Sequence, residues 1–150
     1  MFKPHPMLRR NICLYGIMTE AEADEYYNEW ARIGHLYDNG DYFDIFKSSD
    51  LMITDCCSFL AEYLPTHKPL IRLVNKEGLA FNELGGRLSN CYYNVYNNEE
   101  LLHVFDEVVN RRNDYLRDDR NRIADSLVDR EVPASLRIYE DLLCRIKDGK

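Results

Sequence analysis

Two short apolar runs joined by one short helix constrain the fold of this chain most. The runs are "LMITD" at residues 51–55 and "PLIRLV" at residues 69–74, and "SFLAEYL" at residues 58–64 between them has helical spacing. Pro65 ends that helix because proline lacks the N–H that a further turn needs. Strands joined by a helix pair in parallel, almost always with a right-handed connection. The sequence therefore predicts a βαβ unit and an α/β fold.

Helices and a few further short strands surround this unit. Before the βαβ unit, the predictions are a strand end at 1–6, a helix at 19–33, a short strand and turn at 35–41 with Asn39-Gly40 as the turn, and a helix at 42–48. After it, we expect a polar connection at 75–97 with one strand at 91–95, and then a helix at 98–110. Two further helices, separated near Val132-Pro133, end the chain. Thr19 and Glu22 are spaced as a capping box, and Asn98 is the expected N-cap of its helix.

The overall charge limits the classes of partner. The chain has 26 acidic and 19 basic residues and a formal net charge of −7. This disfavours broad nucleic-acid binding, which needs a basic surface to match phosphate. A small anionic ligand stays compatible, because a local group of backbone N–H groups can outweigh the global charge. The charged run 111–122 is interpreted as a solvated helix face whose arginines could also approach an anionic membrane surface.

Cysteine usage and the absence of long apolar runs predict the compartment. The five cysteines have no metal-like spacing, and the adjacent pair Cys56-Cys57 is poorly placed to form a disulfide with itself, so reduced thiols are expected. No apolar run approaches the roughly 20 residues that span a bilayer, and the first residues lack the apolar core of a signal peptide. We therefore expect a cytoplasmic protein without a bound metal or cofactor.

Polar residues gather at the corner where the first predicted strand passes into its helix. They are Thr54, Asp55, Cys56, Cys57 and Ser58. Ligands of parallel α/β sheets bind at the carboxyl ends of strands, where a helix N-terminus favours phosphate. Glu62 lies one turn beyond Ser58 on the same helix face, and its carboxylate suits a ribose diol. The alternatives stay open: Asp55 and Ser58 as helix caps, Glu62 as a solvated side chain, and the two cysteines as core residues.

A second candidate group is "KPHP" at residues 3–6. The two prolines hold His5 in a stiff loop at a strand end. There His5 could donate to a diphosphate or act as a general acid toward a leaving phosphate. The alternative is an exposed turn histidine, and Lys3 is equally ambiguous. His35, His67 and His103 show no metal spacing.

Taken together, "KPHP" and "DIFKSSDLMITDCCSFLAEYLPTHKPLIRL" resemble the C-terminal half of the CDP-glycerol glycerophosphotransferase family, the teichoic acid polymerase type. The resemblance covers roughly residues 1–110, with 111–150 as a helical extension of the same domain. It implies the C-terminal, Rossmann-like domain of a GT-B fold, lacking its first βα unit. The chain would then be the donor-binding half of an enzyme whose N-terminal domain, with the catalytic base and acceptor site, comes from elsewhere.

The resemblance also implies residue roles. His5 would contact the donor diphosphate or assist its departure, Thr54, Asp55, Cys57 and Ser58 would form the nucleotide corner, and Glu62 would replace the family's acidic ribose ligand. Lys68-Pro69 would match the Lys-Pro that opens the next strand. In "DCCS", Cys56 stands for an aromatic residue and Cys57 for a hydroxyl donor, so one phosphate contact of about 0.5–1.5 kcal/mol is lost.

The activity expected from this resemblance is transfer of a polyol phosphate from a CDP-activated donor to an acceptor hydroxyl, with release of CMP. It would serve teichoic acid or capsular polymer synthesis, with a polymer or lipid-linked acceptor and peripheral contact with the inner face of the cell membrane. One alternative is half of a UDP-sugar glycosyltransferase or epimerase of GT-B fold. Another is a non-catalytic remnant that docks onto a partner chain.

Overall fold

The computed structural model describes residues 1–37, 40–127 and 132–147. The chain divides into two compact units, Met1–Phe43 and Asp44–Lys150. None of the described helices combines the length and hydropathy that crossing a membrane requires. The resemblance predicts a boundary at residue 110, which differs from the division between Phe43 and Asp44. The boundary at residue 110 stays a prediction.

The first unit is built on two helices and a cluster of aromatic rings. Helix α1 (Leu8–Leu14), which the sequence did not predict, precedes α2 (Glu20–Arg32), and Phe2 forms one parallel bridge with Leu36. The capping box at the start of α2 is confirmed: Thr19 Oγ1 accepts from Glu22 N, and Glu22 Oε2 accepts from Thr19 N at 2.8 Å. The ring of Phe2 lies 4.9 Å from that of Trp30, centroid to centroid.

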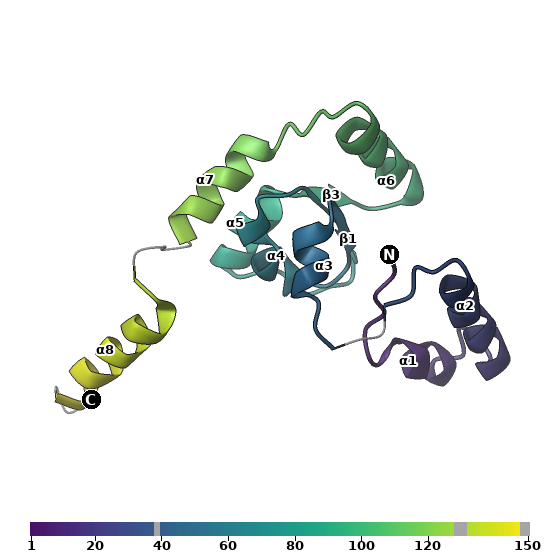
Figure 1. Cartoon of the computed structure of the whole chain (residues 1–150), viewed down its shortest axis with the longest axis horizontal. Helices are drawn as coiled ribbons and strands as arrows, with labels where there is room; N and C mark the ends of the chain where they lie inside the picture. Colours follow the sequence, from purple (N-terminus) through teal and green to yellow (C-terminus); the bar gives the residue numbers. More distant parts are fainter. Residues whose placement is uncertain (38–39, 128–131, 148–150) are drawn as a thin grey trace. The chain divides into compact units, whose positions relative to one another are not determined.

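The second unit contains a three-stranded parallel sheet in the order β1-β2-β3; β1 and β3 are labelled in Figure 1. The strands are β1 (Met52–Thr54), β2 (Leu70–Leu73) and β3 (Tyr93–Val95). Met52 is aligned with Leu70, and Ile71 with Tyr93. The predicted parallel βαβ pairing and the α/β class are confirmed.

Helices flank and follow these strands. They are α3 (Phe43–Ser48), α4 (Phe59–Glu62), the 3-10 turn η1 (Leu64–Thr66), α5 (Glu83–Asn90), α6 (Asn98–Phe105), the π-helical turn η2 (Asp106–Asn110), α7 (Arg117–Leu127) and α8 (Ala134–Lys147). The break between α7 and α8 near Val132-Pro133 is confirmed. Helix α5 was missed, because "NELGGRLSN" carries two glycines, which lower helix propensity.

Two local predictions need correction, and a third is not tested. The crossover helix α4 ends at Glu62, and Pro65 lies inside η1, where a proline near the start of a turn costs no hydrogen bond. The N-cap of α6 is Asn97, whose Oδ1 accepts from Glu100 N at 2.9 Å, so the expectation of Asn98 is wrong by one residue. The predicted turn at Asn39-Gly40 lies partly outside the described residues.

One buried cluster of the second unit lies on one face of the sheet, between β2, β3 and the α6–η2 segment. Ile71, Tyr93 and Val95 are buried there with Val108. Further buried side chains, among them Leu60, Leu70 and Tyr92, lie outside this cluster. The sequence predicted a buried β1, but Ile53 at its centre is 44 % exposed. The physical reason is position: β1 is the edge strand, and α6 packs on β2 and β3.

Candidate functional site

The polar corner follows β1 directly, at the carboxyl end of the parallel sheet. Thr54 is the last residue of β1, and its Oγ1 accepts a hydrogen bond from Cys56 N at 3.0 Å. This short contact closes the turn and leaves Asp55 and Cys57 exposed to solvent. The corner therefore presents one carboxylate and one thiol at the edge where ligands of such sheets bind.

Ser58 occupies the N-cap position of α4 without capping it through its side chain. Its backbone is already helical, with φ −64° and ψ −33°, and its side chain makes no cap hydrogen bond. Ser58 Oγ lies 3.3 Å from Cys56 Sγ instead. The interpretation of Ser58 as a side-chain cap is therefore wrong, because a serine cap needs an extended backbone that aims its oxygen at the first N–H groups.

Glu62 stands one turn after Ser58, as the spacing predicted. Its backbone N–H donates to Ser58 O at 3.2 Å, and the residue is half-buried. The corner residues and Glu62 thus lie within nine consecutive residues, 54–62. The helical turn of α4 fixes their positions relative to one another.

Two further side chains lie at the same edge of the sheet and were missed from the sequence. Lys76 follows β2 by three residues and Tyr96 follows β3 directly; Lys76 Nζ lies 5.8 Å from the centroid of the Tyr96 ring. Carboxyl ends of parallel strands meet at one edge, so the rule that singled out Thr54–Ser58 also applies to these strand ends. The edge thus combines a carboxylate, an ammonium group and an aromatic ring.

His5 lies in the other compact unit, Met1–Phe43, where it is exposed. Its Nδ1 accepts from Met7 N at 3.1 Å, and its carbonyl accepts from Leu8 N at 2.8 Å. An Nδ1 that accepts a hydrogen bond leaves the ring proton on Nε2, so His5 presents an N–H donor to solvent. The expectation that His5 faces the same rim as Ser58 stays a prediction.

The two lysines near the motifs have structural contacts. Lys68 Nζ donates to the carbonyls of Phe46 at 3.1 Å and Lys47 at 2.6 Å, near the C-terminal end of α3, where a cation is stabilised. Lys3 Nζ lies 5.5 Å from the ring centroid of Tyr37 and 5.9 Å from that of Tyr42. These contacts favour a positioning role for both side chains.

A buried polar network ties α7 to the turn before β2. Arg120 is fully buried, forms an ion pair with Asp114, and donates from Nε to the carbonyl of His67 at 3.0 Å. Tyr93 Oη donates to Asp114 Oδ1 at 2.7 Å, and burial raises the pKa of Tyr93. The prediction of a solvated face at 111–122 is therefore wrong at Arg120, whose charge is matched inside the protein.

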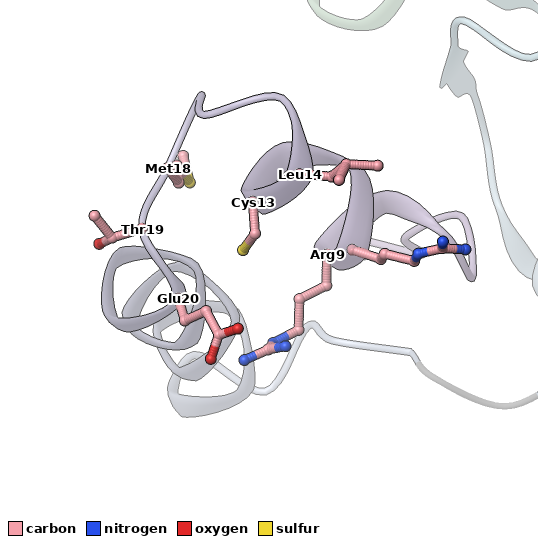
Figure 2. A pocket seen from close by; sticks show the side chains of 7 residues that line it. Arg9, Cys13, Leu14, Met18, Thr19 and Glu20 are labelled. Carbon is pink, nitrogen blue, oxygen red and sulfur yellow. The ribbon is translucent and has the colours of Figure 1, made fainter.

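The first unit contains an open pocket of about 420 Å³ between α1 and the start of α2 (Figure 2). It is lined by Arg9, Arg10, Cys13, Leu14, Met18, Thr19 and Glu20. Arg9 is engaged by Asp24, with Nη2 at 2.6 Å from Oδ1, and this contact raises the pKa of Arg9. Thr19 is likewise held in the capping box, so Arg9 and Thr19 have structural roles in this unit.

Comparison with family models, with curated proteins and with solved structures finds no match to this chain. Across residues 1–37, 40–127 and 132–147, no group of three or more His, Cys, Asp or Glu side chains is placed to hold a metal ion. The arrangement at the sheet edge is thus the main basis for a functional proposal.

Proposed function

We propose that the corner Thr54–Ser58 with Glu62 is the donor site of a CDP-glycerol-like glycerophosphotransferase, and that the sheet is part of a Rossmann-like domain of GT-B type. The observation that carries the proposal is the position of this corner at the carboxyl end of β1, inside a parallel βαβ unit. That position is where open parallel sheets bind nucleotides. The resemblance of the two motifs to this family supplies the substrate class.

In the proposed reaction an acceptor hydroxyl attacks the phosphorus that carries the glycerol unit, and CMP leaves. Ser58 Oγ and the exposed backbone of the corner would bind the phosphates, and Glu62 would accept hydrogen bonds from the ribose diol. His5, with its Nε2–H exposed, would donate to the departing phosphate. Catalysis of this kind rests mainly on positioning and charge neutralisation. The acceptor and the catalytic base would be bound by a second domain or partner chain, near the inner face of the membrane.

The proposal is tested by calorimetric titration of the full chain with CDP-glycerol, CMP and UDP-N-acetylglucosamine. We expect selective binding of the cytidine ligands. Glu62→Ala and His5→Ala should weaken CDP-glycerol binding about tenfold, since a hydrogen bond to a charged group contributes about 1.5 kcal/mol or more. When the ligand is cytidine, which lacks the phosphates, only Glu62→Ala should weaken its binding.

Matched controls are Glu29→Ala and His35→Ala, exposed residues of the first unit, which should bind all ligands as the parent does. Preferential binding of UDP-N-acetylglucosamine would replace the proposal by the UDP-sugar alternative. Absence of binding at millimolar concentration would reject a working donor site in this chain.

A further inference from the structure

The outer edge of β1 carries unpaired backbone groups. Among the described residues, β1 pairs with β2 alone. Met52 N donates to Pro69 O at 3.2 Å, so the backbone of Met52 faces β2. Because successive residues of a strand turn their N–H and C=O groups to opposite sides, the N–H and C=O of Ile53 face outward. An unpaired strand edge of this kind is a template for another strand.

The sheet face beside this edge is also incompletely covered. Ile53 is 44 % and Leu73 39 % exposed, while α6 packs on β2 and β3. The strand itself, Met52–Thr54, contains neither a charged residue nor proline, two of the devices by which sheet edges avoid pairing. A strand added at β1 would pair the backbone of Ile53 and extend the apolar face.

We propose that the β1 edge binds, in parallel, an extended segment of another polypeptide with an apolar centre and basic residues at both ends. The apolar centre follows from the position, because strands inside a parallel sheet are apolar on both faces. The basic ends follow from charge: the exposed carboxylates of Asp50 and Asp55 flank β1, and the described residues provide neither with a hydrogen bond or an ion pair. This inference does not rest on the proposed nucleotide site.

A second copy of the chain fits this edge less well. Two β1 strands related by a two-fold axis would run antiparallel, so Asp50 of each copy would lie near Asp55 of the other. Like charges at opposing strand positions are destabilising. A partner strand with basic ends replaces that repulsion by attraction.

The test uses the full chain and a fluorescein-labelled peptide, Lys-Lys-Val-Ile-Val-Ile-Val-Lys-Lys, followed by anisotropy. We expect saturable binding that weakens with added salt. Ile53→Pro removes the outward N–H at a position where an edge strand tolerates proline, and it should weaken binding at least about tenfold. Asp50→Asn should weaken binding in low salt only. Circular dichroism and urea unfolding of Ile53→Pro establish that the fold is retained.

Two peptide controls keep the test informative even if Ile53→Pro fails to fold. The same peptide with N-methyl groups on its five central residues lacks the backbone donors and should not bind, and a peptide with Glu in place of Lys should bind at least about tenfold more weakly. Equal binding of either control, unaltered binding to Ile53→Pro, or no binding of the parent peptide at 1 mM would overturn the proposal. A dimer of the chain that Ile53→Pro dissociates would identify a second copy as the occupant and overturn the choice of partner.

Discussion

The adjacent tyrosines Tyr92 and Tyr93 are each 2 % exposed, yet their hydroxyl groups differ in hydrogen bonding. Tyr93 Oη donates to Asp114 and accepts from Leu116 N at 3.3 Å. Tyr92 Oη is buried without a hydrogen-bond partner among the described residues. A buried polar group without a partner costs free energy, whereas a paired one contributes to stability.

Phenylalanine substitutions at these two positions should therefore have opposite consequences. Tyr93→Phe removes a donor from the buried Asp114 and should lower the free energy of unfolding by about 1–3 kcal/mol. Tyr92→Phe removes an unpaired hydroxyl and should leave that free energy unchanged or raised. Urea unfolding followed by circular dichroism measures both, each variant serving as the control for the other. Equal losses would contradict the hydrogen-bond assignment.

Burial of Cys91 predicts how stability depends on pH. Burial raises the pKa of the Cys91 thiol from its ordinary value of 9.0 to about 11. Between these values the unfolded chain has lost the thiol proton while the folded chain keeps it, so rising pH favours unfolding. The free energy of unfolding should fall from pH 9 upward, by no more than about 1.4 kcal/mol per pH unit for this group.

The control for this pH effect is Cys91→Ser. In the parent, Cys91 Sγ donates to the carbonyl of Leu88 at 3.1 Å. The serine hydroxyl keeps a donor for that carbonyl but does not titrate in this pH range. The unfolding free energy of Cys91→Ser should fall less steeply between pH 9 and 10. Burial also raises the pKa values of Tyr92 and Tyr93, so both proteins should lose stability above pH 10. Identical slopes below pH 10 would show that Cys91 does not contribute.

At the scale of secondary structure, a side-chain cap decides where α6 begins. Asn97 has an extended backbone, φ −159° and ψ 172°, and its Oδ1 accepts from Glu100 N. Glu100 Oε2 in turn accepts from Tyr96 N at 2.8 Å. This reciprocal arrangement starts α6 directly after β3, so that α6 can pack on the sheet.

Asn97→Ala should therefore lower the free energy of unfolding by about 1 kcal/mol, the usual cost of losing a cap. The control is Asn98→Ala, which changes the same residue type one position later, inside the first turn, and should cost less than about 0.5 kcal/mol. Chemical denaturation of the two variants gives the comparison. A larger loss for Asn98→Ala would restore the cap position predicted from the sequence.

For the whole molecule, the division into two compact units implies unequal stability. Among the described residues of Met1–Phe43, which leave out 38–39, Pro4 and Ala23 alone are buried, whereas the second unit has a buried cluster on its sheet. A unit of this size buries little of its surface and is marginal alone. The two units are therefore expected to unfold at different concentrations of denaturant.

The single tryptophan, Trp30, reports on the first unit alone. Its fluorescence should change at lower urea than the far-ultraviolet circular dichroism, to which both units contribute. A protein comprising residues 44–150 should keep the second, later transition. Coincident transitions of the two signals in the full chain would instead indicate that the units unfold as one.

The sequence by itself determined the features that depend on local spacing. The capping box at Thr19 and Glu22, the short helix at 43–48, and the parallel strands on either side of α4 follow from residue order, because each rests on neighbours within a few positions. The polar corner Thr54–Ser58 could also be predicted from the sequence, since its position follows from the end of an apolar run. Its assignment to a nucleotide site stays a proposal.

Only the tertiary structure decided which face or edge is covered. The sequence predicts Arg120 to be one more exposed charge on a polar helix, yet its side chain is fully buried. Asp114 and the carbonyl of His67, from other parts of the chain, provide its ion pair and hydrogen bond there. The sequence predicts a buried side chain at Ile53, yet this side chain is exposed because β1 is an edge strand. Burial depends on neighbours distant in sequence, and local spacing carries no information about them.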